Sequence, residues 1–192
     1  MQKLYGHMAD VLDMHLDGLY LASCSKDATA RIWLWSDGSD VSSIAEPAEI
    51  DDEVPYPKFI LVRVLGGHRA AVNSVHFIDN IVATASGDRS VRLWHLDTGA
   101  VIQTIQSHNR GISCVQLTPD YIVSGSADHV VKVMDRMTGS QVQCLVWHTG
   151  LVRSLDTNLS LLVTGGYDQT IGVWDVKSGE FLHQVPDWHH SK

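Results

Sequence analysis

The chain has 192 residues, of which 44% are hydrophobic, so it is long and apolar enough to bury a core as one folded domain. Its formal net charge of −8 argues against general nucleic-acid binding, and no stretch approaches the length of a membrane span. Cys24, Cys114 and Cys144 show neither paired nor C-x-x-C spacing and no secretory signal is visible, so we expect reduced thiols in the cytoplasm or nucleus.

The same spacing of four residue types recurs four times along the chain. A histidine is followed after 20 residues by an aspartate, a serine or threonine stands four residues before that aspartate, and a large side chain stands six residues after it. The four sets are His7, Ser23, Asp27 and Trp33; His68, Thr84, Asp88 and Trp94; His108, Ser124, Asp128 and Met134; and His148, Thr164, Asp168 and Trp174. The last three histidines are 40 residues apart, which is the period of a four-stranded propeller blade.

Short β-branched segments separated by turn residues predict four strands in each repeat, as VNSVHF, IVATAS, VRLWHL and VIQTI do in the second. In chain order the predicted blades are residues 10–65, 71–105, 112–146 and 152–185, within one repeat region over residues 1–192. The pattern resembles the WD repeat, which implies an all-β propeller. Rings of that family mostly close with seven blades, so we expect four blades of a larger ring, with QKLY and PDWHHSK as stubs of adjacent blades.

An acidic insertion at residues 36–57 lengthens the first repeat. It holds three prolines and no basic residue, and its acidic residues are Asp37, Asp40, Glu46, Glu49, Asp51, Asp52 and Glu53. It falls between the third and fourth strands of its blade, at the edge opposite the repeated histidines. We favour a flexible, solvated loop over a docking segment for a partner.

In an antiparallel four-stranded blade, the segment before the first strand and the turn between the second and third strands lie at one edge. We call it the histidine edge, because it carries His7, His68, His108 and His148. Each histidine is expected to meet its aspartate there and to join the hydroxyl and the tryptophan in a buried hydrogen-bond network. These residue types also suggest a catalytic triad, but a catalytic site would be single and exposed. Met134 lacks the indole donor, so we expect the third blade to be the least stable.

Loops at the histidine edge also carry side chains that differ between repeats. Positions two, three, five, 19 and 21 residues after each histidine are expected at this rim. They supply the candidates Asn73, Gly87, Arg89, Arg110, Ser113, Leu151, Arg153 and Tyr167, with Lys26 as a further rim residue. A basic, polar rim on an acidic protein suits an acidic or phosphorylated peptide, because guanidinium groups match phosphate oxygens.

Structural roles compete with this functional interpretation. Arg89 follows the turn aspartate, where any polar residue serves, and Lys26 needs only solvent around it. Arg153 opens an inner strand, where an unpaired charge favours a functional role. One position of the third strand is basic in three repeats and is interpreted as blade surface; it holds Arg31, Arg92 and Lys132.

The segments GHRAAVNSVHF, TASGDRSVRLW, SHNRGISCVQL, HTGLVRSL and TGGYDQTIGVWD resemble the middle blades of the β-transducin-repeat-containing F-box proteins, which are substrate receptors of SCF ubiquitin ligases. The resemblance extends from about Gly6 to Trp174. In that family this edge binds a short, doubly phosphorylated degron of the D-S-G-x-x-S type. By matching motif, the resemblance implies phosphopeptide contacts from Asn73, Gly87, Arg89, Arg110, Ser113, Leu151, Arg153 and Tyr167.

The sequence therefore predicts a protein-interaction module and not an enzyme. We expect the substrate-recognition part of an F-box/WD-repeat ligase receptor, which would reach the SCF adaptor only through an F-box that these residues do not contain. The alternative is a WD-repeat scaffold in a multiprotein complex without phosphopeptide recognition. Partners are expected to be proteins, and neither nucleic acid nor membrane. No phosphate loop, nucleophile motif or metal-ligand spacing is visible, so we expect no cofactor and no metal.

Overall fold

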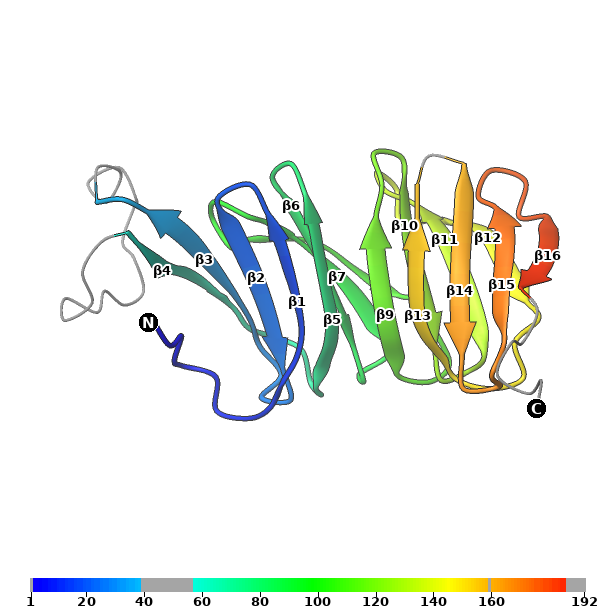
Figure 1. Cartoon of the computed structure of the whole chain (residues 1–192), viewed down its shortest axis with the longest axis horizontal. Coiled ribbons are helices and arrows are strands. Elements are labelled where there is room, and N and C mark those ends of the chain that lie inside the picture. The colour runs from blue at the N-terminus through cyan, green and yellow to red at the C-terminus, as the bar shows by residue number, and fades with distance from the viewer. Residues whose placement is uncertain (1, 39–56, 159, 186–192) are drawn as a thin grey trace, which may run out of the picture.

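A computed structural model describes residues 2–38, 57–158 and 160–185. Within these ranges the chain forms strands and turns without a helix, and sixteen strands make four antiparallel sheets (Figure 1). The predicted all-β class is confirmed. Each sheet corresponds to one sequence repeat, and we call the sheets blades one to four.

The blades follow one another along the chain. Blade one contains β1 (Val11–Asp17), β2 (Tyr20–Ser25), β3 (Ala30–Ser36) and β4 (Lys58–Leu65), and blade two contains β5 (Val72–Ile78), β6 (Ile81–Ser86), β7 (Ser90–His95) and β8 (Val101–Gln106). Blade three contains β9 (Ile112–Leu117), β10 (Tyr121–Ser126), β11 (Val130–Asp135) and β12 (Gln141–Val146), and blade four contains β13 (Val152–Thr157), β14 (Leu161–Gly166), β15 (Ile171–Asp175) and β16 (Phe181–Val185).

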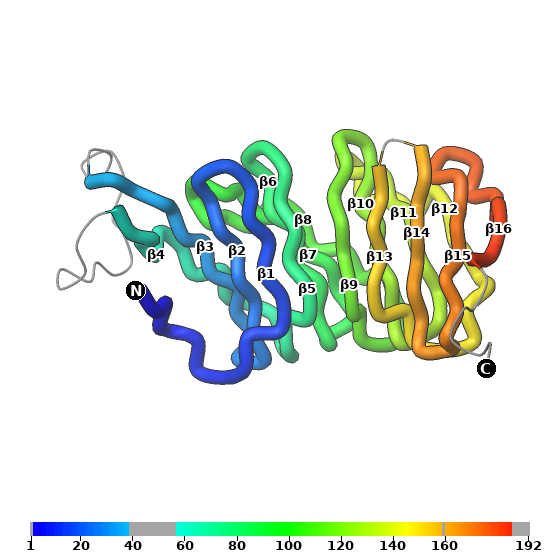
Figure 2. The backbone as a smooth tube through the Cα atoms, in the orientation of Figure 1, coloured from blue at the N-terminus to red at the C-terminus, as the bar shows by residue number. Residues whose placement is uncertain are grey.

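Each blade is a meander in which strands that are neighbours in sequence also pair in the sheet. The first strands of successive blades, β1, β5, β9 and β13, pack against one another. The blades therefore stand in a row in chain order, with blade one at one end of the row and blade four at the other (Figure 2). The histidine edge is the lower edge of the row in Figure 1.

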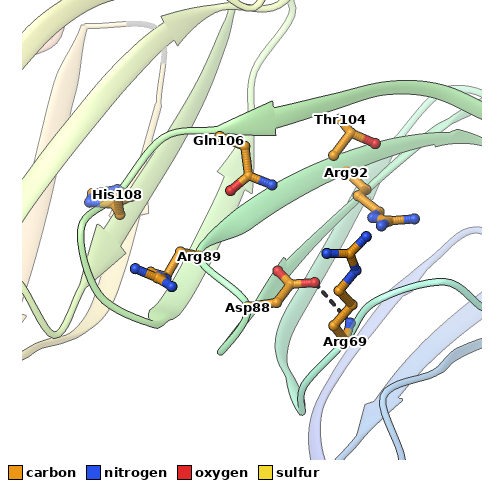
Figure 3. A pocket seen from close by; sticks show the side chains of 7 residues that line it. All are labelled: Arg69, Asp88, Arg89, Arg92, Thr104, Gln106 and His108. Carbon is orange, nitrogen blue, oxygen red and sulfur yellow. Dashed lines mark hydrogen bonds between the residues drawn. The ribbon is translucent and has the colours of Figure 1, made fainter.

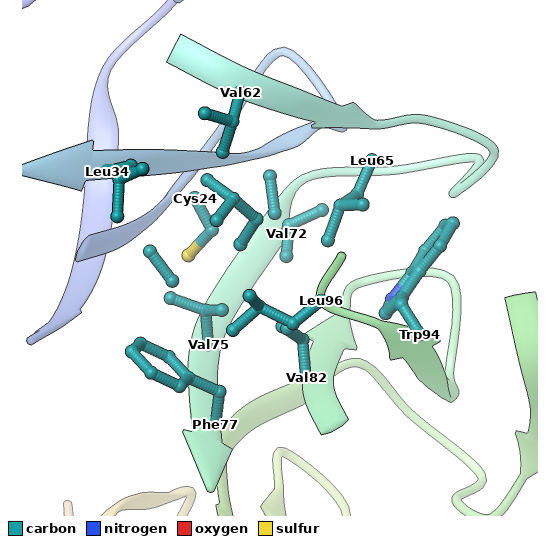
Figure 4. Close-up of a cluster of buried hydrophobic side chains, with 13 residues drawn as sticks. Cys24, Leu34, Val62, Leu65, Val72, Val75, Phe77, Val82, Trp94 and Leu96 are labelled. Atoms are coloured by element: carbon teal, nitrogen blue, oxygen red, sulfur yellow. The ribbon is translucent and has the colours of Figure 1, made fainter. Parts of the chain in front are cut away.

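The hydrophobic core lies between blades. Figure 4 shows the first of these layers, in which Leu34 of blade one faces Val75 and Phe77 of blade two. Alternation along each strand divides its side chains between two layers, because successive residues point to opposite faces of a sheet. Val82 of β6 belongs to the layer toward blade one, whereas its neighbour Ala83 belongs to the layer toward blade three.

The N-terminal stub, expected as the outer strand of a preceding blade, stays a prediction. Residues 2–5 form no strand. The Gln2 side chain instead contacts β4 of blade one, where its Nε2 donates to Phe59 O over 2.8 Å and its Oε1 accepts from Phe59 N over 2.9 Å. Most of the acidic insertion, residues 39–56, and the C-terminal stub at residues 186–192 lie outside the described residues.

Candidate functional site

A series of hydrogen bonds joins four side chains at the histidine edge of blade two. Trp94 Nε1 donates to Thr84 Oγ1 over 2.9 Å, and Thr84 Oγ1 lies 2.8 Å from His68 Nε2. His68 Nδ1 lies 2.8 Å from Asp88 Oδ2. Because an ionised carboxylate can only accept, His68 Nδ1 carries the ring proton, and the Thr84 hydroxyl donates to Nε2. Each group has a partner, which ties the segment before β5 to β6 and β7.

Blades one and four contain the same series of contacts. In blade one, the three successive hydrogen bonds measure 2.9 to 3.0 Å and join Trp33 to Ser23, Ser23 to His7, and His7 to Asp27. In blade four, the same three hydrogen bonds measure 2.8 to 3.0 Å and join Trp174 to Thr164, Thr164 to His148, and His148 to Asp168. The four histidines and their partners therefore form a structural frame that repeats under the whole edge.

Blade three lacks part of this frame. His108 Nε2 lies 2.9 Å from Ser124 Oγ, and His108 Nδ1 lies 3.0 Å from Asp128 Oδ2. Met134 replaces the tryptophan and has no N–H to donate, so the Ser124 hydroxyl receives no indole hydrogen bond. Ser107, which precedes this histidine in place of glycine, has a buried Oγ without a hydrogen-bond partner in the structure.

The structure adds a fifth member that our sequence analysis missed. Two residues after each network aspartate, the hydroxyls of Thr29, Ser90 and Thr170 donate to the aspartate Oδ1 over 2.6 Å. Blade three has Val130 at this position and loses that bond as well. The recurrence of a hydroxyl residue 22 positions after three of the four histidines was visible in the sequence and could have identified this position.

Burial and hydrogen bonding set the charges of the network. Burial alone would raise the pKa of the Asp88 carboxyl, but hydrogen bonds from Ser90 Oγ, Arg69 N and His68 hold that pKa well below its usual range. Burial lowers the pKa of His68 and His108 despite the aspartate beside each ring, so both rings stay neutral at pH 7. In blades two and three, the aspartate is therefore charged and the histidine ring is neutral.

The network geometry resembles that of a catalytic triad, but its hydroxyls cannot reach a substrate. All four network hydroxyl residues are buried: Ser23, Thr84, Ser124 and Thr164. Three of these hydroxyls already accept a hydrogen bond from a tryptophan indole. A nucleophile must be exposed to the group that it attacks. These residues therefore stabilise the fold and perform no chemistry.

β-bulges position one residue at the start of each inner strand. The pairing of the first two strands skips a residue between Val72 and Ser74 in blade two, and the same irregularity recurs in the other three blades. The residues left unpaired are Leu12, Asn73, Ser113 and Arg153. A bulge re-aims a side chain, and bulges are frequent beside functional sites. Three of these four residues are among the candidates taken from the sequence.

The bulged residues nevertheless face different surroundings. Arg153 is exposed and lines a cavity of about 250 Å³ formed by β1, β5, β9 and β13. Asn73 is half-buried, and its Nδ2 donates to Ile112 O over 2.7 Å. Ser113 is buried, and its Oγ donates to Gly125 O over 3.1 Å and to Val152 O. The Ser113 hydroxyl is thus used between blades three and four, and its expected contact with a peptide stays a prediction.

The other candidates lie on the loops of the histidine edge. Gly87, Arg89, Arg110 and Tyr167 are exposed, whereas Leu151 is half-buried and its carbonyl accepts from Tyr167 N over 2.8 Å. A Cβ at Gly111 would lie 3.2 Å from Gly87 Cα, so the Arg110 loop passes directly beside the turn of blade two.

Two candidate arginines and the rim lysine differ in their surroundings. Lys26 is exposed and pairs with Asp10, at 2.7 Å between Nζ and Oδ2, which satisfies its charge. Arg89 does not share the cavity of Arg153; it lines a separate cavity of about 470 Å³ together with Arg69 and Arg92 (Figure 3). Arg69 and Arg92 are thus basic residues of this edge that the sequence analysis did not select.

Other site chemistries find no support among the described residues. No group of three or more histidine, cysteine or acidic side chains in them is placed to hold a metal ion. No helix in the same part of the chain is long and apolar enough to cross a membrane. Burial raises the pKa of the Cys114 thiol to about 12, so this cysteine stays protonated and unreactive at neutral pH.

Comparison with known proteins identifies the repeat. The family model described as "WD domain, G-beta repeat" matches residues 1–33, 59–95, 99–135 and 139–175. Among curated relatives, the nuclear distribution protein nudF of Aspergillus niger is 31% identical over 113 residues, which are 55% of this chain and 21% of nudF. The F-box/WD repeat-containing protein sel-10 of Caenorhabditis elegans is 29% identical over 103 residues, 53% of this chain and 14% of sel-10. The chain thus spans about a fifth or less of these relatives.

Solved structures show the same architecture. The computationally designed Ika8 protein superimposes with a TM-score of 0.77 at 25% identity, over 94% of this chain and 50% of Ika8. The WD40 β-propeller domain of Doa1 superimposes with a TM-score of 0.74 at 23% identity, over 94% of this chain and 54% of that chain. The row of blades is therefore the arrangement found in a propeller.

Proposed function

The chain belongs to the WD domain, G-beta repeat family, and from that premise we propose that it is a scaffold that holds partner proteins in a multiprotein assembly. Chains of this family are protein-interaction modules, in which the repeated network supplies rigidity and the surfaces supply binding. The similarity to nuclear distribution proteins supports the scaffold role more strongly than the resemblance to F-box proteins supports a ligase role.

The observation that carries this proposal is the apolar surface at the two ends of the row. Met14 and Leu16 on β1 are 63% and 62% exposed. Val75 and Phe77, the corresponding residues of β5, are 2% exposed, because blade one covers them. The outer face of blade one thus has the side chains of an interface between blades, without a neighbour among the described residues.

The face of blade four shows the same contrast. Val163 on β14 is 38% exposed, whereas Val123, the corresponding residue of β10, is fully buried against blade four. A monomeric protein rarely leaves such apolar surfaces in contact with water, and they mark sites of association. We expect these two faces to be covered in the assembled protein, either by further blades of the ring or by a partner polypeptide.

A second candidate function is recognition of a phosphorylated peptide, as in an F-box/WD-repeat receptor. It is favoured by the exposed Arg110 and Arg153 on an otherwise acidic protein, with Tyr167 on the same edge. Arginine binds phosphate through paired N–H donors, and the bulge at the start of β13 presents Arg153 to solvent. The similarity to sel-10 supports this narrower role.

One experiment compares two double variants of exposed residues, Leu16→Glu with Val163→Glu, and Arg110→Glu with Arg153→Glu. Partner capture is measured by affinity purification and mass spectrometry, with and without phosphatase treatment. The scaffold proposal expects the first pair to reduce capture, and the second pair and the phosphatase to leave it unchanged. Loss of capture after phosphatase treatment and with the arginine pair, but not with the end-face pair, would refute the scaffold proposal and support the phosphopeptide receptor.

Calorimetry with a synthetic D-S-G-x-x-S peptide tests the second candidate directly. A doubly phosphorylated peptide is expected to bind with an affinity that falls with added salt, since ionic contacts are screened. Arg153→Glu is expected to abolish that binding. Equal binding of the phosphorylated and unphosphorylated peptides would refute the phosphopeptide role.

A further inference from the structure

Blade two has a cavity of about 470 Å³ between its histidine edge and its two outer strands. Arg92 on β7 and Thr104 on β8 are paired across the sheet, and Gln106 lies two residues further along the same side. Arg69, which follows the network histidine, and Arg89, which follows the network aspartate, complete the wall. We call this cavity the arginine pocket; its main lining residues are Arg69, Asp88, Arg89, Arg92, Thr104 and Gln106 (Figure 3).

The positive charge in the arginine pocket exceeds its internal counter-charge. Asp88 is the one carboxylate among the lining residues, and its oxygens already accept from His68 Nδ1 at 2.8 Å, from Arg69 N at 3.0 Å and from Ser90 Oγ at 2.6 Å. Asp88 is therefore fully used by the structural network. It faces three guanidinium groups that it cannot also neutralise.

The guanidinium groups have unused donors. Arg92 Nε is buried without a hydrogen-bond partner in the structure, and the Arg92 guanidinium lies 5.9 Å from the Trp94 ring. Figure 3 shows the side chains of Arg69 and Arg92 pointing toward one another across the pocket. Like charges that converge in a half-buried site repel one another, and an unpaired buried donor costs about 1–3 kcal/mol. An anion between the Arg69 and Arg92 guanidinium groups would relieve this repulsion.

The propeller itself does not require these arginines. The three positions that hold Arg69, Arg89 and Arg92 in blade two hold Met8, Ala28 and Arg31 in blade one, Asn109, His129 and Lys132 in blade three, and Thr149, Gln169 and Gly172 in blade four. Arg31 donates through its Nη2 to Gly6 O, so even the matching arginine of blade one is used within its own blade. The combination of three arginines is therefore particular to blade two, although the Arg92 position is basic in three blades and Arg31 Nε is buried without a hydrogen-bond partner as Arg92 Nε is.

We propose that the arginine pocket binds a phosphate monoester dianion, held between the Arg69 and Arg92 guanidinium groups with the Thr104 hydroxyl and the Gln106 amide as further donors. The charge of three cations is better balanced by a dianion than by a carboxylate ligand, which carries one negative charge. Planar guanidinium groups also fit phosphate oxygens in a bidentate manner. The pocket lies on the outer strands of blade two, whereas Arg153 lines the cavity among the inner strands. The pocket is thus distinct from the cavity of Arg153 and from the two end faces, although it shares Arg89 with the phosphopeptide candidates.

The test is a titration of the chain, followed by calorimetry, with inorganic phosphate, with a peptide that carries one phosphoserine and with the unphosphorylated peptide. Arg69→Gln is the main variant, because the Arg69 side chain is exposed and makes no hydrogen bond or ion pair with the described residues. Arg92→Gln is the second variant. Lys132→Gln, at the corresponding position of blade three, is the matched control.

Both phosphate-bearing probes are expected to bind the unmodified chain, and Arg69→Gln is expected to weaken both at least about tenfold, which is the loss of one charge-assisted contact. Lys132→Gln should leave binding unchanged. If the phosphopeptide binds and inorganic phosphate does not, the proposal stands and the ligand is a phosphorylated partner protein. Unchanged affinity in Arg69→Gln, or no binding of either probe, overturns it. Loss of peptide binding in Arg153→Glu but not in Arg69→Gln also overturns it, while leaving the phosphopeptide function of the inner edge intact.

Discussion

Met134 occupies the strand position from which a tryptophan donates to the buried hydroxyl in the other three blades, so Ser124 retains only His108 as its network partner. This difference predicts unequal costs for removing the hydroxyl. Thr84→Val would leave both the Trp94 indole and His68 Nε2 unpaired, whereas Ser124→Ala would leave only His108 Nε2 unpaired. Each buried unpaired group costs about 1–3 kcal/mol, so Thr84→Val should lower the free energy of unfolding by about twice as much. Urea unfolding measures both values, and equal losses would contradict the role given to the indole.

Blade three can be repaired at a single position. Val130 stands where Thr29, Ser90 and Thr170 donate to their aspartates, and Asp128 Oδ1 lacks that donor. Val130→Thr adds the hydroxyl with little change in volume and should raise the unfolding free energy by about 1 kcal/mol. The reverse change in blade four, Thr170→Val, is the matched control and should lower it by a similar amount. If Val130→Thr is destabilising, the missing bond is not what distinguishes blade three.

His76 predicts a loss of stability in mild acid. Burial, with a smaller contribution from the neighbouring His15, lowers the pKa of His76 to about 4. The unfolded chain therefore takes up a proton near pH 6.5 that the folded chain refuses, so stability is full above about pH 6.5 and falls as the pH drops toward 4. The loss from this residue is on the order of 3 kcal/mol. His76→Gln introduces the residue that blade three has at the corresponding position, Gln116. It should reduce the pH dependence of the unfolding free energy between pH 7 and 5. An unchanged pH dependence would contradict the role given to His76.

Arg89 predicts a trade between stability and binding. Its backbone has a φ of 72°, which costs a non-glycine residue about 1–2 kcal/mol, while glycine costs about 0.5–1 kcal/mol through the freedom of the unfolded chain. Arg89→Gly should therefore raise the unfolding free energy by up to about 1 kcal/mol and weaken phosphate binding in the arginine pocket. Ala28→Gly, at a φ of 67° in blade one, is the control and should be stabilising without any effect on binding. A destabilised Arg89→Gly would show that its side chain supports the fold.

Much of the fold follows from spacing alone. The intervals between His68, Thr84, Asp88 and Trp94 already determine which strands must pair for these side chains to meet, because an antiparallel meander brings the first loop and the second turn to one edge. The repeat pattern also places Arg153 at the opening of an inner strand. These relationships lie within one blade and depend on short-range geometry. The spacing that indicates this geometry occurs in all four repeats of the sequence.

Side-chain surroundings were decided only by the tertiary structure. Ser113 and Arg153 occupy the same bulge position, yet Ser113 is buried against β13 while Arg153 has no further blade to cover it among the described residues. Arg69 and Arg92 are 23 residues apart in sequence, and only the packing of β7 beside the histidine segment brings them into one cavity. The sequence by itself determined the repeat, the network and the edge at which the candidate binding residues gather. Which cations meet, and which are left unpaired, depended on contacts between segments and on the neighbour of each blade, and no periodic pattern contains that information.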